Sequence, residues 1–218
     1  MSSDRLRVAL VDDLPVVREG FSVLHPQVEV VAAFATVEEM VEAFGEIPGV
    51  DLVVLDLHLR TSVGDQIQGL AAVRVAASLG VPVCLYTGEE RRLVVARCLQ
   101  QGANGVVHKQ DAPEEAAQAF QVVAAGGTHL SASVVGLAEV LERQGDLPDL
   151  TERQREVLSG RARGESWRII ARRLDISEGV AREHMSAVAG KFAEHLRDTS
   201  PADLERALGL SPGDLLAP

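Results

Sequence analysis

Two things that many proteins have are scarce in this sequence. Cysteine occurs only at Cys84 and Cys98, too few for the disulfide framework of a small secreted domain, and we assign neither residue a function. Long apolar runs are also missing. The first one, Val8 to Val11, ends at Asp12 and is too short for a signal-peptide core or a membrane span. We therefore expect a cytoplasmic protein with no membrane partner.

Lysine is scarce as well, and the charge is unevenly distributed. Of the 21 basic residues only Lys109 and Lys191 are lysine, which suggests that arginine is disfavoured at these two positions. The net charge of −11 opposes binding to the phosphates of nucleic acid if it is spread over the chain. However, residues 1–130 hold nine basic against seventeen acidic residues, whereas residues 151–197 hold ten against seven. The basic charge is thus concentrated near the C-terminus.

The first 126 residues alternate between short apolar runs and amphipathic stretches. A chain of 218 residues with 46% apolar residues is long enough for two globular domains. The apolar runs predict strands at 7–11, 28–33, 51–55, 82–86 and 105–108. Apolar residues spaced three and four apart predict helices at 15–24, 37–45, 67–79, 90–101 and 112–125. This order predicts a doubly wound α/β domain with a five-stranded parallel sheet.

Only helical patterns follow the α/β domain. We interpret residues 127–149 as a linker with a helix at 131–143, and residues 150–218 as a small all-α domain with a C-terminal extension. Helix-start and helix-stop residues mark its elements: Thr151 with Gln154, Gly164, Ser166, Ser177 and Pro201. The third helix should bury a stripe and end near Lys191, the stripe being Ala181, Met185, Val188 and Phe192.

Polar residues end four of the predicted strands. They are Asp12 and Asp13 after the first strand, Asp56 after the third, Thr87 after the fourth and Lys109 after the fifth. Because ligands of open parallel sheets bind outside the carboxyl ends of the strands, we expect these residues to line one cleft. Each alone could instead cap a helix or sit in a turn. Clustered carboxylates need a cation, and an oxygen-lined site suits Mg²⁺.

A carboxylate beside Mg²⁺ can act as a nucleophile toward a phosphoryl group. We assign that role to Asp56. Lys109 would supply a compact ammonium that offsets the charge of the transferring oxygens, and Thr87 would hydrogen-bond one of them.

These residues resemble the signature of the receiver domain of bacterial two-component response regulators over roughly residues 5–125. The resemblance implies that a sensor histidine kinase phosphorylates Asp56. It also implies that Asp13 and Asp56 hold Mg²⁺ with help from Asp12 and the backbone carbonyl of His58. The protein would not be an enzyme, apart from slow self-dephosphorylation.

Three features depart from or extend the receiver pattern. Val106 stands where the family usually has an aromatic residue that turns inward when the threonine engages phosphate. The loop from Thr61 to Gln68 is longer than usual, with Arg60 in place of the customary proline. His58 and Glu89 lie two residues beyond Asp56 and Thr87, flanking the path of a hydrolytic water in the family, so we predict that they tune the lifetime of the phosphoryl group.

The excess of arginine on two consecutive short helices favours a DNA interface, although each arginine alone would be an ordinary surface charge. Residues 150–193 resemble the LuxR-type helix-turn-helix. The third helix would then enter the major groove, where Glu183 could accept a hydrogen bond from cytosine or repel phosphate. The candidate DNA-binding residues are Arg168, Arg172, Arg173, Ser177, Arg182, Glu183, His184, Ser186 and Lys191.

Together the two resemblances predict a DNA-binding transcriptional response regulator of the NarL/FixJ type. Its partners would be DNA, a sensor histidine kinase and a second copy of the chain, with residues 201–208 as a candidate dimer helix. An atypical regulator controlled by a ligand or a partner protein is the main alternative. A Mg²⁺-dependent phosphohydrolase and a helical protein-interaction module are the others, although the former lacks an aspartate two residues after Asp56.

Overall fold

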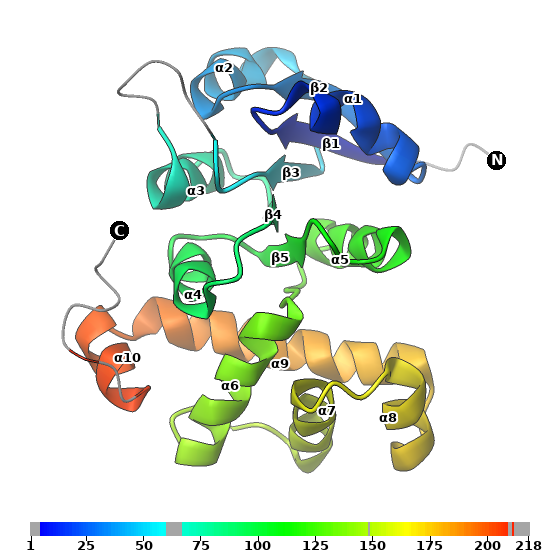
Figure 1. The fold of residues 1–218 in the computed structure, drawn as a ribbon, viewed down its shortest axis with the longest axis vertical. Coiled ribbons are helices and arrows are strands. Elements are labelled where there is room, and N and C mark those ends of the chain that lie inside the picture. The colour runs from blue at the N-terminus through cyan, green and yellow to red at the C-terminus, as the bar shows by residue number, and fades with distance from the viewer. Residues whose placement is uncertain (1–4, 60–66, 148, 209–210, 212–218) are drawn as a thin grey trace. The chain divides into compact units, whose positions relative to one another are not determined.

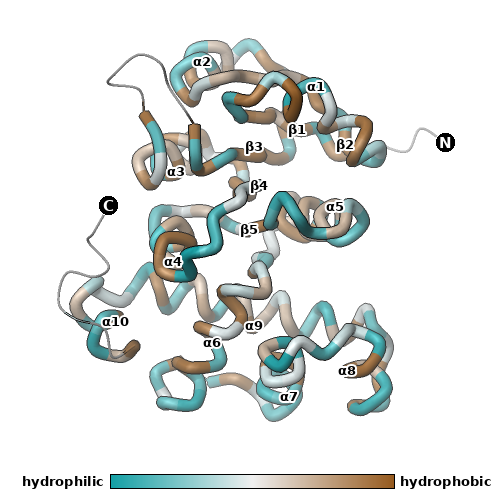
Figure 2. Tube along the Cα trace, viewed as in Figure 1, coloured by the Kyte–Doolittle hydropathy of each residue, from teal (hydrophilic) through white to brown (hydrophobic). Residues whose placement is uncertain are grey.

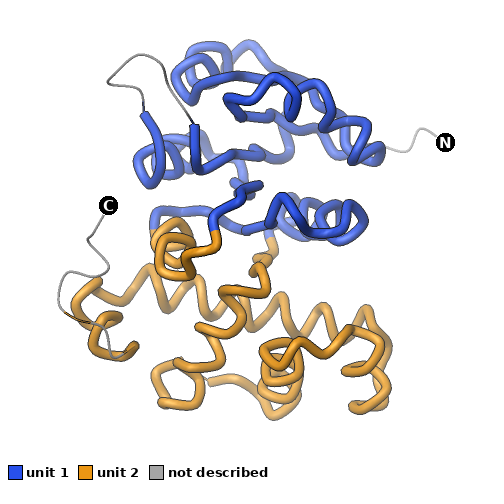
Figure 3. Tube along the Cα trace, viewed as in Figure 1, with its two compact units in different colours: residues 1–89, 101–126 blue, residues 90–100, 127–218 orange. Residues whose placement is uncertain are grey.

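The computed structural model describes residues 5–59, 67–147, 149–208 and 211. By its internal contacts the chain forms two compact units, one of residues 1–89 and 101–126 and one of residues 90–100 and 127–218 (Figure 3). Residues 60–66, which include Arg60 and most of the predicted long loop, lie outside the described residues. No helix in the described part of the chain is long and apolar enough to cross a membrane.

The first unit is built on a five-stranded parallel sheet in the order β2-β1-β3-β4-β5 (Figure 1). This confirms the doubly wound α/β fold that the alternating sequence pattern predicts. All four residues of the β3 strand are apolar (Figure 2) and fully buried, as expected for a central strand covered on both faces. The strands are β1 (Leu6–Val11), β2 (Val28–Phe34), β3 (Leu52–Leu55), β4 (Val83–Thr87) and β5 (Gly105–His108).

Helices cover both faces of this sheet. One face packs against α1 (Pro15–Leu24) and α5 (Pro113–Ala124), and the other against α2 (Val37–Ala43) and α3 (Gly69–Ala77) (Figure 1). A short 3-10 turn, η1 (Phe44–Glu46), continues α2. Because all strands run parallel, their carboxyl ends emerge at one edge of the sheet.

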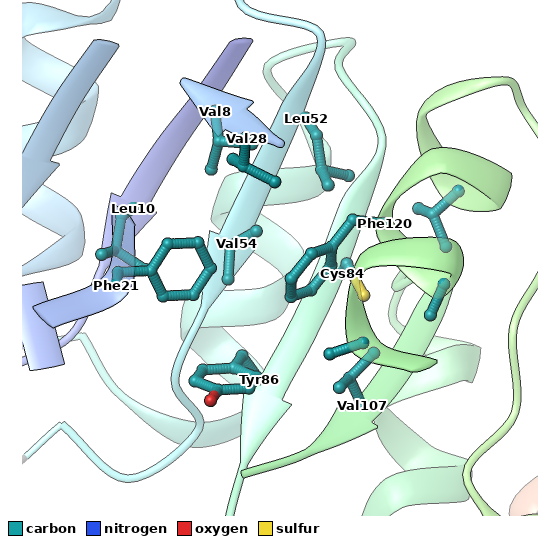
Figure 4. Close-up of a cluster of buried hydrophobic side chains, with 13 residues drawn as sticks. Val8, Leu10, Phe21, Val28, Leu52, Val54, Cys84, Tyr86, Val107 and Phe120 are labelled. Atoms are coloured by element: carbon teal, nitrogen blue, oxygen red, sulfur yellow. The ribbon is translucent and has the colours of Figure 1, made fainter. Parts of the chain in front are cut away.

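An aromatic cluster fills the face of the sheet that α1 and α5 cover (Figure 4). The ring of Phe21 lies 5.4 Å from that of Tyr86 and 5.8 Å from that of Phe120, measured between centroids. His25 joins the cluster with its ring 4.6 Å from Phe21 and is 1% exposed. Three aromatic residues of the α/β unit, Phe21, Tyr86 and Phe120, are thus gathered in one place, where they join α1 to α5.

The second unit is entirely helical in the part of the chain that the structure describes. The predicted helix starts are confirmed: Thr151 and Gln154 form a reciprocal capping box, and Ser166 and Ser177 accept backbone N–H groups at their own helix starts. Asp175 ends a helix with the left-handed φ of 55°. The helices are α4 (Arg92–Gln100), α6 (Ala132–Gln144), α7 (Glu152–Ala162), α8 (Trp167–Leu174), α9 (Glu178–Asp198) and α10 (Pro201–Ala207).

The α9 helix buries the stripe predicted from the sequence, and it is longer than predicted. All four stripe residues are buried, and the buried face continues through Ala193 and Leu196. The expectation that Lys191 ends this helix is therefore wrong. The helix continues to Asp198 because no glycine or proline follows Lys191 until Pro201, which begins α10.

The α4 helix packs on α9 and α6 within the second unit. Gln100 donates its side-chain Nε2–H to the backbone oxygens of Leu196 and Thr199, at 2.8 and 3.2 Å. These carbonyl oxygens lie at the C-terminal end of α9, where helices have no internal donors left. A side chain of α4 thus satisfies the end of α9, a contact that the sequence pattern does not predict.

Candidate functional site

The carboxyl ends of β1 and β3 bring three aspartates together. One carboxylate oxygen from each of Asp12, Asp13 and Asp56 lies within 4.8 Å of the others. Asp12 is 1% and Asp56 5% exposed, whereas Asp13 is half-buried. Grouping two buried carboxylates is costly unless cations compensate their charge.

Lys109, which directly follows β5, provides one such cation. Its Nζ donates to Asp12 Oδ2 and to Asp56 Oδ2, both at 2.7 Å. Burial alone would lower the pKa of Lys109, but the hydrogen bonds to Asp12 and Asp56 outweigh it, so the pKa is raised above its ordinary value. The side chain therefore remains a fixed ammonium, as the sequence predicts for this rare lysine.

A single ammonium does not fully compensate the negative charge of the three aspartates. Burial raises the pKa of Asp12, although hydrogen bonds from Lys109 and from the Leu14 backbone N–H act in the opposite direction. The site thus retains unbalanced negative charge among hard oxygen donors, and this set of donors fits a small divalent cation such as Mg²⁺.

Thr87 is the last residue of β4 and is fully buried. Its Oγ1 accepts a hydrogen bond from the backbone N–H of Glu89 at 3.2 Å. A hydroxyl that accepts one bond still has its own O–H to donate. The hydroxyl proton of Thr87 is therefore available for a hydrogen bond, and its donation to an oxygen at the acidic site stays a prediction.

His58 and Glu89 are brought into direct contact. The distance from His58 Nε2 to Glu89 Oε2 is 3.2 Å, and Glu89 is almost fully buried while His58 is exposed. The backbone N–H of His58 also donates to Asp56 Oδ1 at 3.3 Å. The sequence analysis singles out both residues but does not predict that they touch across two loops.

Some of the predicted DNA-binding residues in the helical unit are exposed, and some make side-chain contacts within the unit. Arg168, Arg172 and Arg173 on α8 are all exposed, and Arg173 also pairs with Glu165 at 3.0 Å. Lys191 donates to the backbone oxygen of Asp149 and to Gln154 Oε1, so it holds the start of α7.

The remaining candidates lie on α9 or begin it. Ser177 is the N-cap of the helix, and Glu183 is exposed. Arg182 pairs with Glu178 at 4.0 Å, and Ser186 donates to the backbone oxygen of Thr128 at 3.4 Å. The half-buried residues among them are Arg182, His184 and Ser186.

Comparison with known families matches both units. A family model described as the response regulator receiver domain matches residues 8–121. A second, described as bacterial regulatory proteins of the luxR family, matches residues 148–198. The chain belongs to the response-regulator receiver family. With its LuxR-type helix-turn-helix it has the domain combination of the NarL/FixJ-type response regulators.

Relatives of this response regulator match it over most of its length. A nitrate/nitrite response regulator protein homolog of Haemophilus influenzae is 31% identical over 202 residues, covering 89% of this chain and 93% of the relative. The transcriptional regulatory protein LnrK of Bacillus subtilis is 27% identical over 211 residues, covering 90% and 94%.

Solved structures agree in fold. The RcsB response regulator of Salmonella typhimurium superimposes with a TM-score of 0.54 at 21% identity, covering 94% of this chain and 98% of that one. A LuxR-family two-component response regulator from Aurantimonas sp. gives a TM-score of 0.54 at 29% identity, covering 65% and 99%.

Some features of the response regulator were missed by the sequence analysis. Arg18 on α1 donates to the backbone oxygen of Asp12 at 2.6 Å, holding the strand end that carries the acidic pair. Trp167 contacts two arginines on neighbouring helices. Val106, by contrast, was singled out from the sequence, and it is buried in β5 as an aliphatic residue. Sequence periodicity carries no information about the side-chain contacts of Arg18 and Trp167. The position of the single tryptophan at a predicted helix start is the one signal in the sequence that could have marked Trp167 as a candidate.

Proposed function

We propose that this response regulator binds DNA and controls transcription, and that a sensor histidine kinase controls it by phosphorylating Asp56. The observation that carries the proposal is the convergence of three aspartates and Lys109 around one carboxylate. Such a site can accept a phosphoryl group. In this proposal the protein acts as a phosphoryl acceptor, with slow self-dephosphorylation at most.

In the transfer step, a carboxylate oxygen of Asp56 attacks the phosphorus of a kinase phosphohistidine, and the imidazole leaves. Asp12, Asp13, Asp56 and the backbone carbonyl of His58 would hold Mg²⁺, which would supply positive charge to the phosphoryl oxygens. Lys109 offsets the remaining charge as a fixed ammonium. Thr87 donates a hydrogen bond from its hydroxyl to a phosphoryl oxygen, so that phosphorylation changes the contacts at the end of β4.

The lifetime of the phosphoryl group depends, in this proposal, on the His58–Glu89 contact. The pair spans the two loops beside Asp56 and controls the approach of water. Replacing both residues with alanine should change the rate of dephosphorylation, measured by intact mass after the phosphodonor is removed. The exposed neighbour Glu90 offers a matched control, since Glu90→Ala should leave the rate unchanged. An unchanged rate in the double variant would refute the assignment.

For DNA, we propose that α9 enters the major groove and that α8 contacts the backbone. The interface would comprise Arg168, Arg172, Arg173, Ser177, Arg182, Glu183, His184, Ser186 and Lys191. Arg168 and Arg172 should contribute more to affinity than Arg173, because Arg173 is paired with Glu165. A structure of an RcsB–DNA complex is among the folds that this chain resembles, at 19% identity.

A second copy of the chain should be required for tight binding. One helix-turn-helix offers a small contact area, and two copies can use two half-sites. The α10 helix is our candidate for the dimer contact.

The decisive experiment compares wild type with Asp56→Asn. Both proteins are incubated with Mg²⁺ and acetyl phosphate, then assayed by intact mass and by retention of DNA. Wild type should gain the mass of one phosphoryl group and retain more DNA, Asp56→Asn should do neither, and a chelator should abolish the gain. A wild type that binds DNA but never takes up a phosphoryl group would instead support control by a ligand or partner protein.

A further inference from the structure

Trp167 is the only tryptophan of the chain, and it contacts two arginines from different helices. It is the first residue of α8. The guanidinium carbon of Arg161, in the last turn of α7, lies 4.4 Å from the ring centroid, and that of Arg182, in α9, lies 4.7 Å from it. We call these three side chains the Trp167 stack. The stack therefore joins all three helices of the helix-turn-helix.

The contact with the ring leaves the hydrogen-bond donors of Arg182 available. A guanidinium attracted to an aromatic face engages the ring electrostatically and needs none of its five N–H groups for that contact. In the described part of the chain, the guanidinium of Arg182 makes no hydrogen bond to another residue, and its ion pair with Glu178 is long at 4.0 Å. Besides that long ion pair, the ring of Trp167 is the described contact that can restrain the plane of this guanidinium.

Arg161 is held more firmly than Arg182. Its Nη1 donates to the backbone oxygen of Glu165 at 2.8 Å, so one side of the stack is fixed to the turn between α7 and α8. Placing a second guanidinium on the same ring brings two positive charges close together, and an electronegative ligand would offset their repulsion. The arrangement is therefore compatible with a site that meets the acceptor groups of DNA.

Arg182 lies in the N-terminal half of α9, next to the exposed Glu183 and close to the exposed Val180. In a helix-turn-helix this end of the recognition helix faces the base edges. A planar guanidinium matches the O6 and N7 acceptors of guanine, provided that it is held in the correct plane. Fixing its orientation before binding removes a rotamer cost that is otherwise incurred on the DNA.

We propose that Trp167 and Arg161 are positioning residues that hold Arg182 for a bidentate contact with one guanine in the major groove. The proposal rests on the DNA-binding function proposed above and adds a determinant of specificity to it. Trp167 and Arg161 act through Arg182, and only Arg182 touches the base.

The stack itself is tested without DNA. Because Trp167 is the only tryptophan, the intrinsic fluorescence of the full-length chain reports on its surroundings alone. Arg182→Ala and Arg161→Ala should each shift the emission maximum and increase quenching by acrylamide. Arg197→Ala, an exposed position near the far end of α9, is the matched control and should change neither. Unchanged emission in both stack variants would overturn the proposal.

The role in recognition is tested on a duplex selected from a randomised pool by the full-length protein with Mg²⁺ and acetyl phosphate. Affinities are measured for this duplex and for each of its single-base-pair variants. Arg182→Ala should lose about tenfold discrimination at one G·C pair, and Trp167→Ala should lose most of it at the same pair. Trp167→Phe keeps an aromatic face and should retain part of the discrimination, which guards against misfolding of the alanine variant.

Two further variants distinguish a loss of Arg182 positioning from a general weakening of DNA binding. Arg168→Ala should weaken binding to all duplexes evenly, as expected for a phosphate contact. The Trp167→Ala/Arg182→Ala double variant should lose no more discrimination than Arg182→Ala alone. If the wild type discriminates but Trp167→Ala retains full discrimination, the stack proposal fails while DNA binding stands. If the wild type selects no duplex at all, the DNA-binding proposal fails and this one with it.

Discussion

At the residue scale, Lys109 contacts two buried carboxylates at 2.7 Å each. Removing one partner of a buried ion pair leaves the other charge uncompensated, at a cost of about 3 kcal/mol. We expect Lys109→Met to lower the free energy of unfolding by about 2 kcal/mol in the presence of a chelator, since Lys109 is partly exposed. Because Mg²⁺ would restore positive charge to the site, the loss should shrink in its presence.

The Lys109 prediction is measured by urea unfolding with and without Mg²⁺. Arg206→Met is the control, because Arg206 and its partner Asp203 are both exposed and such pairs contribute little. Equal losses for the two variants, or a loss at Lys109 that Mg²⁺ does not reduce, would contradict the charge balance described above.

His25 gives the protein a pH dependence that is separate from the acidic site. Burial among Phe21, Tyr86 and Phe120 lowers the pKa of His25 below its ordinary 6.5. The interaction of the imidazole with the Pro113 backbone acts in the opposite direction and offsets part of this shift. Above pH 6.5 the imidazole is neutral in both folded and unfolded chains. As the pH falls below 6.5 the unfolded chain takes up this proton first, so stability is lost progressively until the pKa of the folded state is reached.

The matched variant is His25→Phe, which cannot take up the proton. Its free energy of unfolding should depend less steeply on pH between about 6.5 and 5 than that of the wild type. Above pH 7 the difference between the two proteins should be constant. Parallel curves throughout the acid range would show that His25 does not titrate as its burial implies.

Whether the sequence predicts that two side chains meet depends on whether the backbone or the side-chain rotamers bring them together. Asp12, Asp56 and Lys109 were predicted to meet, and they do, because parallel strands carry their last residues to one edge. The approach of Thr87 to these side chains stays a prediction. The Trp167 stack was not predicted. It depends on the rotamers of three side chains from three helices, and sequence spacing carries no information about such rotamers.

At the scale of elements, Gly160 sets how closely α8 approaches α7. A Cβ at this position would lie 2.9 Å from Ile170 Cγ1 and 2.7 Å from Arg173 Nη2, so a neighbour would have to move. Gly136 in α6 has no such neighbour within 4 Å. Gly160→Ala should lower the free energy of unfolding by about 1 kcal/mol, because overpacking outweighs the gain in helix propensity.

Gly136→Ala is the natural counterpart to that variant. It should raise the free energy of unfolding by about 0.5 kcal/mol, since alanine restricts the unfolded chain and nothing blocks its methyl group. The two changes are chemically identical, so opposite signs in parallel thermal and urea unfolding would isolate the packing at Gly160. Stabilisation by both would contradict the close approach of α7 and α8.

The helix starts were predictable from the sequence, and one helix end was not. Serine and threonine caps leave a local signature, and Thr151, Ser166 and Ser177 all cap as predicted. The end of α9 has no such signature near Lys191, and the buried face simply continues to Leu196. The contact of α4 with α9 was equally invisible, since it joins residues about a hundred positions apart in the chain.

At the scale of the whole molecule, a net charge of −11 must coexist with binding to a polyanion. The affinity should therefore depend on a few local arginines and should fall steeply as salt is raised. Arg172→Ala should reduce the slope of log affinity against log salt by about 1, because one phosphate contact is lost. Arg143→Ala, at an exposed position of α6 outside the proposed DNA and dimer contacts, changes the net charge equally and should leave the slope unchanged. Equal slopes for all three proteins would exclude Arg172 from the DNA interface.

The coupling of phosphorylation to DNA binding is the property that the sequence leaves most open, because Val106 replaces the usual aromatic switch. Since Val106 is buried and aliphatic, we expect the response to rest on Thr87, whose hydroxyl proton is available to a phosphoryl oxygen. Thr87→Ala should still take up a phosphoryl group from acetyl phosphate, measured by intact mass, but should gain no DNA affinity from it. Thr87→Ser restores the hydroxyl and should restore the gain. A Thr87→Ala protein that responds like the wild type would place the coupling elsewhere in the chain.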